Sequence, residues 1–267
     1  MDDFKNNIAC LVEYDGSNFC GFQKQEKDKN ARTIQTELEK SLSKFTLEPI
    51  KIVTAGRTDT GVHALGQVIN FKTNITRPKQ NWIRGTNALL PQDIVILDCA
   101  DVPLDFNARF SATQRTYHYY LLSAPVRPVI LNKKIGWTHH ALDYQKMKEA
   151  CNYLIGTHDF SCFRAANCQA NNPIKQMTQS DVSMIKDNLF CFKFTANSFL
   201  YHMIRNIIGA LVYVGIGKIS ITDFINLINL KNRMKSPPTF MSDGLYLDHI
   251  TYDTDVLQFK QQQRNVI

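Results

Sequence analysis

The first half of the chain has apolar patterns that predict an alternation of strands and helices. The apolar run over residues 8–14 predicts a strand, and Thr33 is a typical helix N-cap before a helix with one apolar face. That face is formed by Ile34, Leu38, Leu42 and Phe45. The same reasoning predicts strands over residues 51–55, 65–72 and 93–99, a helix over residues 79–89 and a connector over residues 101–108. This order is typical of a split β-α-β unit.

The second half has a similar order of elements without similar sequence. Phe190, Phe192 and Phe194 alternate with more polar residues, which predicts a strand with one apolar face, and Asp187-Asn188 predicts the turn before it. The remaining predicted elements are strands over 115–123 and 245–252, helices over 143–155 (closed by Gly156) and 200–214, and a short helix after Thr222. We therefore predict an α+β chain with mainly antiparallel sheets and two halves, residues 1–105 and 106–267.

A short loop bounded by glycines contains the strongest candidate for chemistry. Arg57 and Asp59 lie between Gly56 and Gly61, and the predicted strand that follows anchors the loop on a sheet. A nearby guanidinium favours an ionised carboxylate, which could act as a nucleophile or a base. By residue type alone, an inert ion pair that stabilises the loop is the commoner explanation. We expect Thr58, His63 and Gln67 to stabilise this loop.

The string GRTDTGVHA, residues 56–64, resembles the signature of the tRNA pseudouridine synthases of the TruA type. The resemblance implies that Asp59 is the catalytic carboxylate and that Arg57 supports it and contacts the RNA. Thr60 occupies a position where alanine is often found, which is a small change in size. Three further strings, FSATQRTYHYY, NSFLYHMIRNIIGALVYVG and GLYL, follow in the order typical of the family.

The string FSATQRTYHYY interleaves aromatic and basic residues, a combination that suits nucleic acid. Tyr117 and Tyr119 share one predicted strand face, with Arg109 and Arg115 nearby. For Tyr119, and for Tyr120 beside it, packing within the sheet is the better explanation. The resemblance implies that Tyr117 packs against the target uracil and is a candidate for removing the proton from its carbon 5.

The predicted helix over 200–214 has a small polar seam on an otherwise apolar surface. His202, Arg205, Asn206 and Gly209 recur at helical spacing along it. On residue type alone, a structural ion pair is the better explanation for a lone arginine there. The resemblance implies that Arg205 pairs with Asp59.

Two weaker candidate site residues lie near the two ends of the sequence stretch that resembles the family. Leu245 would line the base pocket, although an ordinary core leucine is nearly as good an explanation. Lys24 would contact RNA, although a solvated charge is the commoner role of a single lysine, and Phe22 stands where the family usually has tryptophan. Residues 162–165 also resemble a family string, whose role the sequence does not reveal.

Composition agrees with a nucleic-acid partner but does not establish one. The 267 residues contain 31 Lys and Arg against 24 Asp and Glu, a formal charge of +7, which favours a polyanionic ligand. Many proteins are mildly basic without such a ligand. The seven cysteines form no Cys-x-x-Cys pair, so neither a disulfide framework nor a zinc ribbon is indicated. No apolar run reaches membrane-spanning length and no signal-peptide pattern is present, so we expect a cytoplasmic protein.

The resemblance implies a complete activity and architecture. The reaction is the isomerisation of uridine to pseudouridine at positions 38, 39 and 40 of the tRNA anticodon stem-loop, by a homodimer without cofactor or metal. The fold is the pseudouridine synthase fold, two ferredoxin-like halves whose sheets join around a basic central cleft. The main alternative is a non-catalytic RNA-binding protein, although the aromatic motif of that class is absent. A methyl-transferring enzyme is also disfavoured, because no glycine-rich cofactor loop follows a strand.

Overall fold

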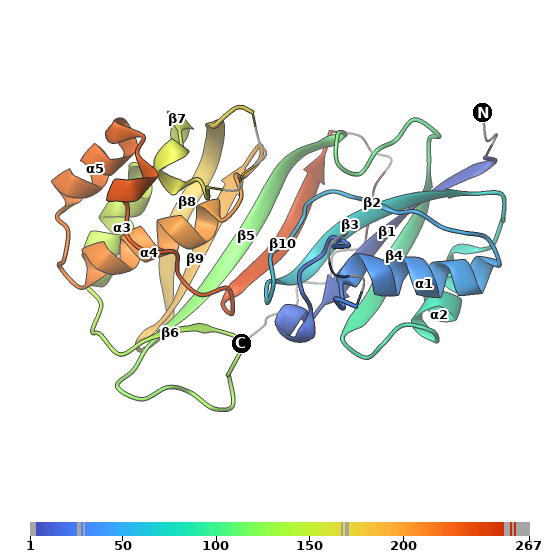
Figure 1. Ribbon diagram of the computed structural model, residues 1–267, viewed down its shortest axis with the longest axis horizontal. Coiled ribbons are helices and arrows are strands. Elements are labelled where there is room, and N and C mark those ends of the chain that lie inside the picture. Colours follow the sequence, from blue (N-terminus) through green and yellow to red (C-terminus); the bar gives the residue numbers. More distant parts are fainter. Residues whose placement is uncertain are drawn as a thin grey trace. The chain divides into compact units, whose positions relative to one another are not determined.

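The computed structural model describes residues 4–25, 28, 30–166, 168, 171–253, 257 and 259. Contacts within the chain divide it into two α+β units (Figure 1). Unit 1 contains the residues up to Thr113 together with those from Leu247 onward, and unit 2 contains Gln114–Tyr246. Among the described residues, no helix combines the length and apolar character needed to cross a membrane. All seven cysteines are free thiols.

Unit 1 has the predicted order of strands and helices. The elements are β1 (Asn6–Tyr14), α1 (Ile34–Thr46), β2 (Val53–Thr54), β3 (His63–Thr73), α2 (Lys79–Asn87) and β4 (Ile94–Val102). β1 pairs antiparallel with both β3 and β4, and β2 pairs antiparallel with β3. In Figure 1, α1 and α2 lie side by side against this sheet. The split β-α-β pattern is thereby confirmed.

The helices of unit 1 begin and pack as their sequence patterns predict. The Thr33 hydroxyl accepts a hydrogen bond from the Thr36 N–H, which caps α1, and Leu38 and Leu42 are fully buried on its inner face. Trp82 of α2 is buried, and its ring meets Phe45 of α1 and Phe71 of β3 edge-on, with centroids 5.6 and 5.5 Å apart. This contact joins both helices to the strand that follows the candidate loop.

Unit 2 is built on β5 (Ala112–Ser123), whose first two residues belong to unit 1. The other elements are β6 (Gly136–Thr138), α3 (Tyr144–Asn152), β7 (Gly156–Asp159), β8 (Ile174–Lys186), β9 (Leu189–Ala196), α4 (Met203–Gly215) and α5 (Ile221–Leu230). β5, β9, β8 and β7 pair in that order and antiparallel, whereas β6 pairs parallel with β5. Three short 3-10 helices complete the described elements: Gly16–Asn18 in unit 1, and Ser161–Phe163 and Arg233–Lys235 in unit 2.

Local sequence patterns predict the turn before β9 correctly, but they misplace two helix boundaries. Asn188 has φ 61°, a conformation that asparagine tolerates, so the predicted turn is confirmed. α4 begins three residues later than predicted because His202, at φ 60°, is left-handed and interrupts the helix. Gly156, at φ 114°, begins β7 and does not close α3, which ends at Asn152.

The last strand, β10 (Leu245–Tyr252), was predicted with these bounds and contributes to both units. The Gly244 carbonyl accepts the Tyr120 N–H of β5 at 2.9 Å, within unit 2. Further along the strand, a Cβ on Gly66 of β3 would lie 2.2 Å from the Asp248 carbonyl oxygen, so the backbones of unit 1 touch there. The observed division therefore differs from the expected halves, 1–105 and 106–267, in the boundary after Thr113 and in the placement of the end of β10.

Candidate active site

The candidate loop connects β2 to β3 in unit 1, and the side chain of Gln67 holds its first turn. The Gly56 N–H donates to Gln67 Oε1 at 3.3 Å, and Gln67 Nε2 donates back to the Gly56 carbonyl at 2.6 Å. The Thr54 hydroxyl donates to the same carbonyl at 3.1 Å. Gln67 is fully buried, so one amide side chain of β3 satisfies both polar groups of Gly56. The expectation that Gln67 stabilises the loop is confirmed.

The centre of the loop is held by Tyr14, at the end of β1. The Tyr14 and Thr58 hydroxyls share a hydrogen bond of 2.7 Å, and both side chains are buried. Burial raises the pKa of Tyr14 to about 12, so its hydroxyl stays neutral at physiological pH. Sequence reasoning missed Tyr14, although it lies in the apolar run over 8–14. This hydrogen bond fixes the residue directly before Asp59.

Gly21 allows a second segment to touch the backbone of the loop. The Phe22 N–H donates to the Thr58 carbonyl at 3.0 Å. Gly21 has φ +86°, and a Cβ there would lie 3.0 Å from the Thr58 oxygen and 3.3 Å from the Asp59 carbonyl carbon. Only glycine combines this conformation with this close approach. The segment of Gly21 and Phe22 therefore acts as a rigid support beneath Asp59.

Asp59 itself is half-buried at the tip of this supported loop. Its carbonyl accepts the Val62 N–H at 3.1 Å, and Gly61, at φ +78°, permits the tight turn between them. His63 at the start of β3 is buried, and its Nδ1 lies 3.1 Å from both the Gly16 N and the Asp15 Oδ1. The carboxylate is thus carried by a turn whose two ends are fixed to the sheet.

Arg57 is exposed on the same loop. Partial desolvation lowers its pKa, and the positive charge of Arg109 lowers it further. Two guanidinium groups of unit 1 therefore lie near each other beside the loop that carries Asp59. This concentration of positive charge fits an anionic ligand such as an RNA phosphate.

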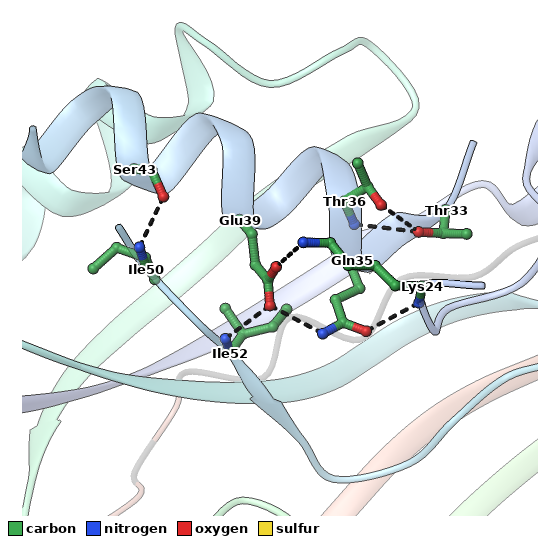
Figure 2. A network of polar contacts seen from close by, with 8 residues as sticks. All are labelled: Lys24, Thr33, Gln35, Thr36, Glu39, Ser43, Ile50 and Ile52. Carbon is green, nitrogen blue, oxygen red and sulfur yellow. Dashed lines mark hydrogen bonds and ion pairs between the residues drawn. The ribbon is translucent and has the colours of Figure 1, made fainter. Parts of the chain in front are cut away.

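Lys24 is paired with a carboxylate inside unit 1. Its Nζ forms an ion pair with Glu39 Oε2 of α1, and its backbone N–H donates to Gln35 Oε1 at 3.1 Å (Figure 2). The other Glu39 oxygen, Oε1, accepts hydrogen bonds from Gln35 Nε2 at 2.9 Å and from the Ile52 N–H at 3.2 Å. The Lys24 side chain remains 50% exposed, whereas the Glu39 side chain is 9% exposed.

The network around Glu39 connects both approaches to the loop. Lys24 follows the support formed by Gly21 and Phe22, and Ile52 directly precedes β2. The carbonyls of Gly21 and Phe22 also accept the first N–H groups of α1, from Ile34 and Gln35. One buried carboxylate therefore fixes two places along the chain: Lys24, which follows the Gly21-Phe22 support, and Ile52, which leads into the strand before the Asp59 loop. Glu39 was not singled out from the sequence, because an acidic residue on a helix is ordinarily solvated.

The tyrosines of β5 are packed within unit 2. Tyr117 is buried, with its ring edge-on to Phe199 at 5.1 Å. Tyr119 is fully buried and donates its hydroxyl to the Met241 carbonyl at 3.0 Å, and burial raises its pKa well above the usual value. Tyr120 is also buried, so the expectation of sheet packing for Tyr119 and Tyr120 is confirmed.

Arg205 lies on α4 and is fixed to the segment that precedes β10. Its Nε donates to the Phe240 carbonyl at 3.0 Å, and its own carbonyl accepts the Phe240 N–H at 3.1 Å. Gly209, one turn later, lets the Pro238 carbonyl approach to 2.2 Å from where a Cβ would be. This close contact sets the position of Arg205 along the segment.

Asn206, the next residue of α4, is a buried polar junction. Its Nδ2 donates to the Phe163 carbonyl at 2.6 Å, and its Oδ1 accepts from Thr239 and Arg233 at 2.6 and 3.1 Å. Phe163 belongs to the family-like string over 162–165, so that string has a structural role: it anchors α4. Leu245 is buried at the start of β10.

The predicted site residues thus fall into two groups. Asp59, Arg57 and Lys24 belong to unit 1, and Tyr117, Arg205 and Leu245 belong to unit 2. Within the part of the chain that the structure describes, no group of three or more His, Cys, Asp or Glu side chains is placed to hold a metal ion.

Comparison with known proteins identifies the family. A family model described as tRNA pseudouridine synthase matches residues 10–111 and 150–253. The chain belongs to the tRNA pseudouridine synthase family. It is 50% identical over 246 residues to a tRNA pseudouridine synthase A of Nitrosomonas eutropha, covering 92% of this chain and 87% of that protein. It is 47% identical over 248 residues to the protein of that name in Neisseria meningitidis serogroup B, covering 93% and 92%.

The match to the tRNA pseudouridine synthase family covers most of the predicted site. Its first segment includes Asp59, Arg57 and Lys24, and its second includes Arg205 and Leu245. Tyr117 lies between the matched segments. The recognition made from the four sequence strings is therefore confirmed, and so is the α+β fold class.

The ion pair of Lys24 and Glu39 can be tested as a structural unit with a double-mutant cycle. We expect Glu39→Gln to lower the free energy of unfolding by about 1–2 kcal/mol, because a charged hydrogen bond is replaced by a neutral one. Lys24→Met should cost less, and the double variant should cost less than the sum of the two. Urea unfolding measures all three, with the exposed Lys40→Met as control. Strict additivity would show that the pair contributes nothing to stability.

Proposed function

We propose that this protein converts uridine to pseudouridine in tRNA, with Asp59 as the catalytic carboxylate. Membership of the tRNA pseudouridine synthase family supports the reaction. The observation that carries the role of Asp59 is its support: Gln67, Tyr14 and the Gly21-Phe22 segment fix the loop around a half-buried carboxylate. So much fixed structure around one acidic side chain is typical of a positioned catalytic group.

The proposed reaction is an isomerisation. The bond between ribose C1′ and uracil N1 breaks, the base turns, and a new bond forms between C1′ and C5. The proton on C5 leaves to solvent and N1 gains one, so atoms and electrons balance without an oxidant or a reductant. Asp59 either attacks C1′ or removes the neighbouring ribose proton. Both routes use a carboxylate in its ionised form, which is the usual form of aspartate at neutral pH.

We propose that Arg57 binds the RNA beside the target. A uridine stacked in a stem must be flipped out before its C1′ can be reached. The Arg57 side chain is exposed on the same loop as Asp59, two residues away, so it could occupy the space that the base leaves. Lys24 is the weakest candidate for RNA contact, because its ammonium is already paired with Glu39.

The proposed roles in unit 2 follow from the resemblance. Arg205 would be the ionic partner of Asp59, Tyr117 would pack against the uracil, and Leu245 would line the base pocket. Their own surroundings support a fixed position for each: Arg205 on Phe240, Tyr117 on Phe199, and Leu245 buried in its strand. We also propose positions 38, 39 and 40 of the anticodon stem-loop as targets, a homodimeric state and a cytoplasmic location.

Removing the charge of Asp59 tests the reaction directly. We expect Asp59→Asn to bind tRNA and to form no product, because the amide has nearly the same shape but is neither a base nor a nucleophile. The assay uses an unmodified tRNA transcript with tritium on C5 of its uridines and counts label released to solvent. The exposed Asp105→Asn is the matched control and should release label like the unsubstituted protein.

The same assay separates the two functional hypotheses. Label release by the unsubstituted protein but not by Asp59→Asn supports the isomerase and its carboxylate. No release from a transcript that is shown to bind would favour a non-catalytic RNA-binding protein. Residual release by a homogeneous Asp59→Asn preparation would remove Asp59 from the chemistry.

The hydroxyl of Tyr14 provides a test of loop positioning. Tyr14→Phe removes the hydrogen bond to Thr58 while it keeps the buried ring. We expect kcat to fall about tenfold or more, since a small displacement of a reacting group is costly, and KM to change little. The free energy of unfolding should fall by only about 1 kcal/mol. The control is Tyr153→Phe, at a tyrosine that is 41% exposed; equal kcat for both variants would contradict the positioning role.

A further inference from the structure

A turn of unit 1, residues 107–111, presents an exposed aromatic ring to solvent. The Phe110 side chain is 78% exposed, and the guanidinium of Arg109 lies 5.4 Å from the centre of its ring. A large apolar ring in water costs free energy without contributing to the core. The turn follows β4 and precedes β5, and neither strand needs an aromatic residue at this point.

The turn is built to hold one shape. The Asn107 side-chain oxygen accepts hydrogen bonds from the backbone N–H groups of Arg109 and Phe110, at 3.0 and 3.1 Å. The Ser111 N–H donates to the Asn107 carbonyl at 2.9 Å. These three bonds satisfy the backbone N–H groups of Arg109, Phe110 and Ser111 within the turn. Arg109 and Phe110 are therefore displayed from a backbone that is already ordered.

Buried groups attach this turn to the sheet of unit 1. The Ala108 N–H donates to Asn70 Oδ1 of β3 at 2.8 Å, and the Ala108 carbonyl accepts the Tyr252 hydroxyl at 2.8 Å. Asn70 is buried, and its Nδ2 donates to Asn7 Oδ1 of β1 at 2.9 Å. A buried amide pair that serves an otherwise exposed turn gives that turn the rigidity of the core.

The turn also carries charge toward the loop of Asp59. The positive charge of Arg109 is close enough to Arg57 to lower the pKa of Arg57. Two neighbouring guanidiniums repel each other, and an anion that binds both relieves the repulsion. The geometry places the Arg109 guanidinium against the planar apolar surface of Phe110, and the charge of Arg109 acts on Arg57, a second phosphate-binding group.

We propose that Arg109 and Phe110 form a binding site for single-stranded RNA beside the loop of Asp59. An unpaired base would stack on the Phe110 ring, and Arg109 with Arg57 would hold the adjacent phosphate. An unpaired RNA base offers a flat apolar face, and the ribose links it to a phosphate. The turn displays a binding group for each, the Phe110 ring for the base and the Arg109 guanidinium for the phosphate. The inference depends on the proposed function only in that RNA is the occupant.

Substitutions of Phe110 test the stacking. Phe110→Leu keeps an apolar side chain but removes the flat ring, and Phe110→Tyr keeps the ring. Binding of an unmodified tRNA transcript, measured by filter retention, should weaken about fivefold or more for Phe110→Leu. Phe110→Tyr should restore affinity to near that of the unsubstituted protein. On a fully base-paired RNA duplex, which has no unpaired base, Phe110→Leu should have no effect.

Substitution of Arg109 tests the phosphate contact. Arg109→Gln should lower affinity for the tRNA transcript and for the duplex alike, and reduce the slope of log K against log salt by about one. The exposed Lys40→Gln, on α1, is the matched control and should leave the slope unchanged. Thermal unfolding of each variant checks that the fold is intact.

Two results would overturn the proposal. The first is equal tRNA binding by Phe110→Leu and the unsubstituted protein. The second is a change of oligomeric state in sedimentation with RNA binding unchanged, which would assign Phe110 to a contact between copies of the chain. The binding series needs no turnover, so a protein that binds tRNA through this turn but releases no tritium would refute the proposed reaction alone. Normal tritium release with normal binding by Phe110→Leu would refute only this site.

Discussion

The structure of the candidate site depends on one constraint: an irregular loop of eight residues between β2 and β3 cannot hold a side chain in place by its own hydrogen bonds. Gln67 supplies what the loop lacks, since its amide both donates to and accepts from Gly56. Tyr14 fixes Thr58 through the single hydrogen bond that their hydroxyls share. Both side chains come from strands of one sheet, so the rigidity of the sheet is transmitted to the residues on either side of Arg57 and up to Asp59.

The close approach of a second backbone segment also holds the loop in place. Gly21 and Gly16 lie where a side chain would strike the loop, at the Thr58 and Val62 carbonyls. With no side chain there, the segment after β1 can lie directly against the loop and donate the Phe22 N–H to it. Glu39 then fixes both this segment and the chain entering β2. A buried carboxylate on α1 thereby contributes to the geometry of a half-buried one, Asp59, by fixing the segments that support its loop.

The sequence was sufficient for features that depend on local pattern. The Thr33 cap, the apolar face of α1, the turn at Asn188 and the bounds of β10 all follow from neighbouring residues. β6 and β7 were missed because strands of three and four residues carry too little periodicity. The start of α4 was misplaced because a left-handed His202 has no signal of its own.

The polar contacts that define the site could not be predicted for a different reason. Gln67 and Tyr14 are 53 positions apart, and Glu39 meets Ile52 across 13, so no local pattern joins them. Residue type predicts that the Glu, Gln and Asn side chains are exposed, because these residues ordinarily are. Glu39, Gln67 and Asn70 are buried here because each satisfies backbone groups of a segment that lacks regular structure. At these three positions a buried amide or carboxylate therefore marks an irregular segment that must be held still, and the turn displaying Phe110, held by Asn70, is one such segment.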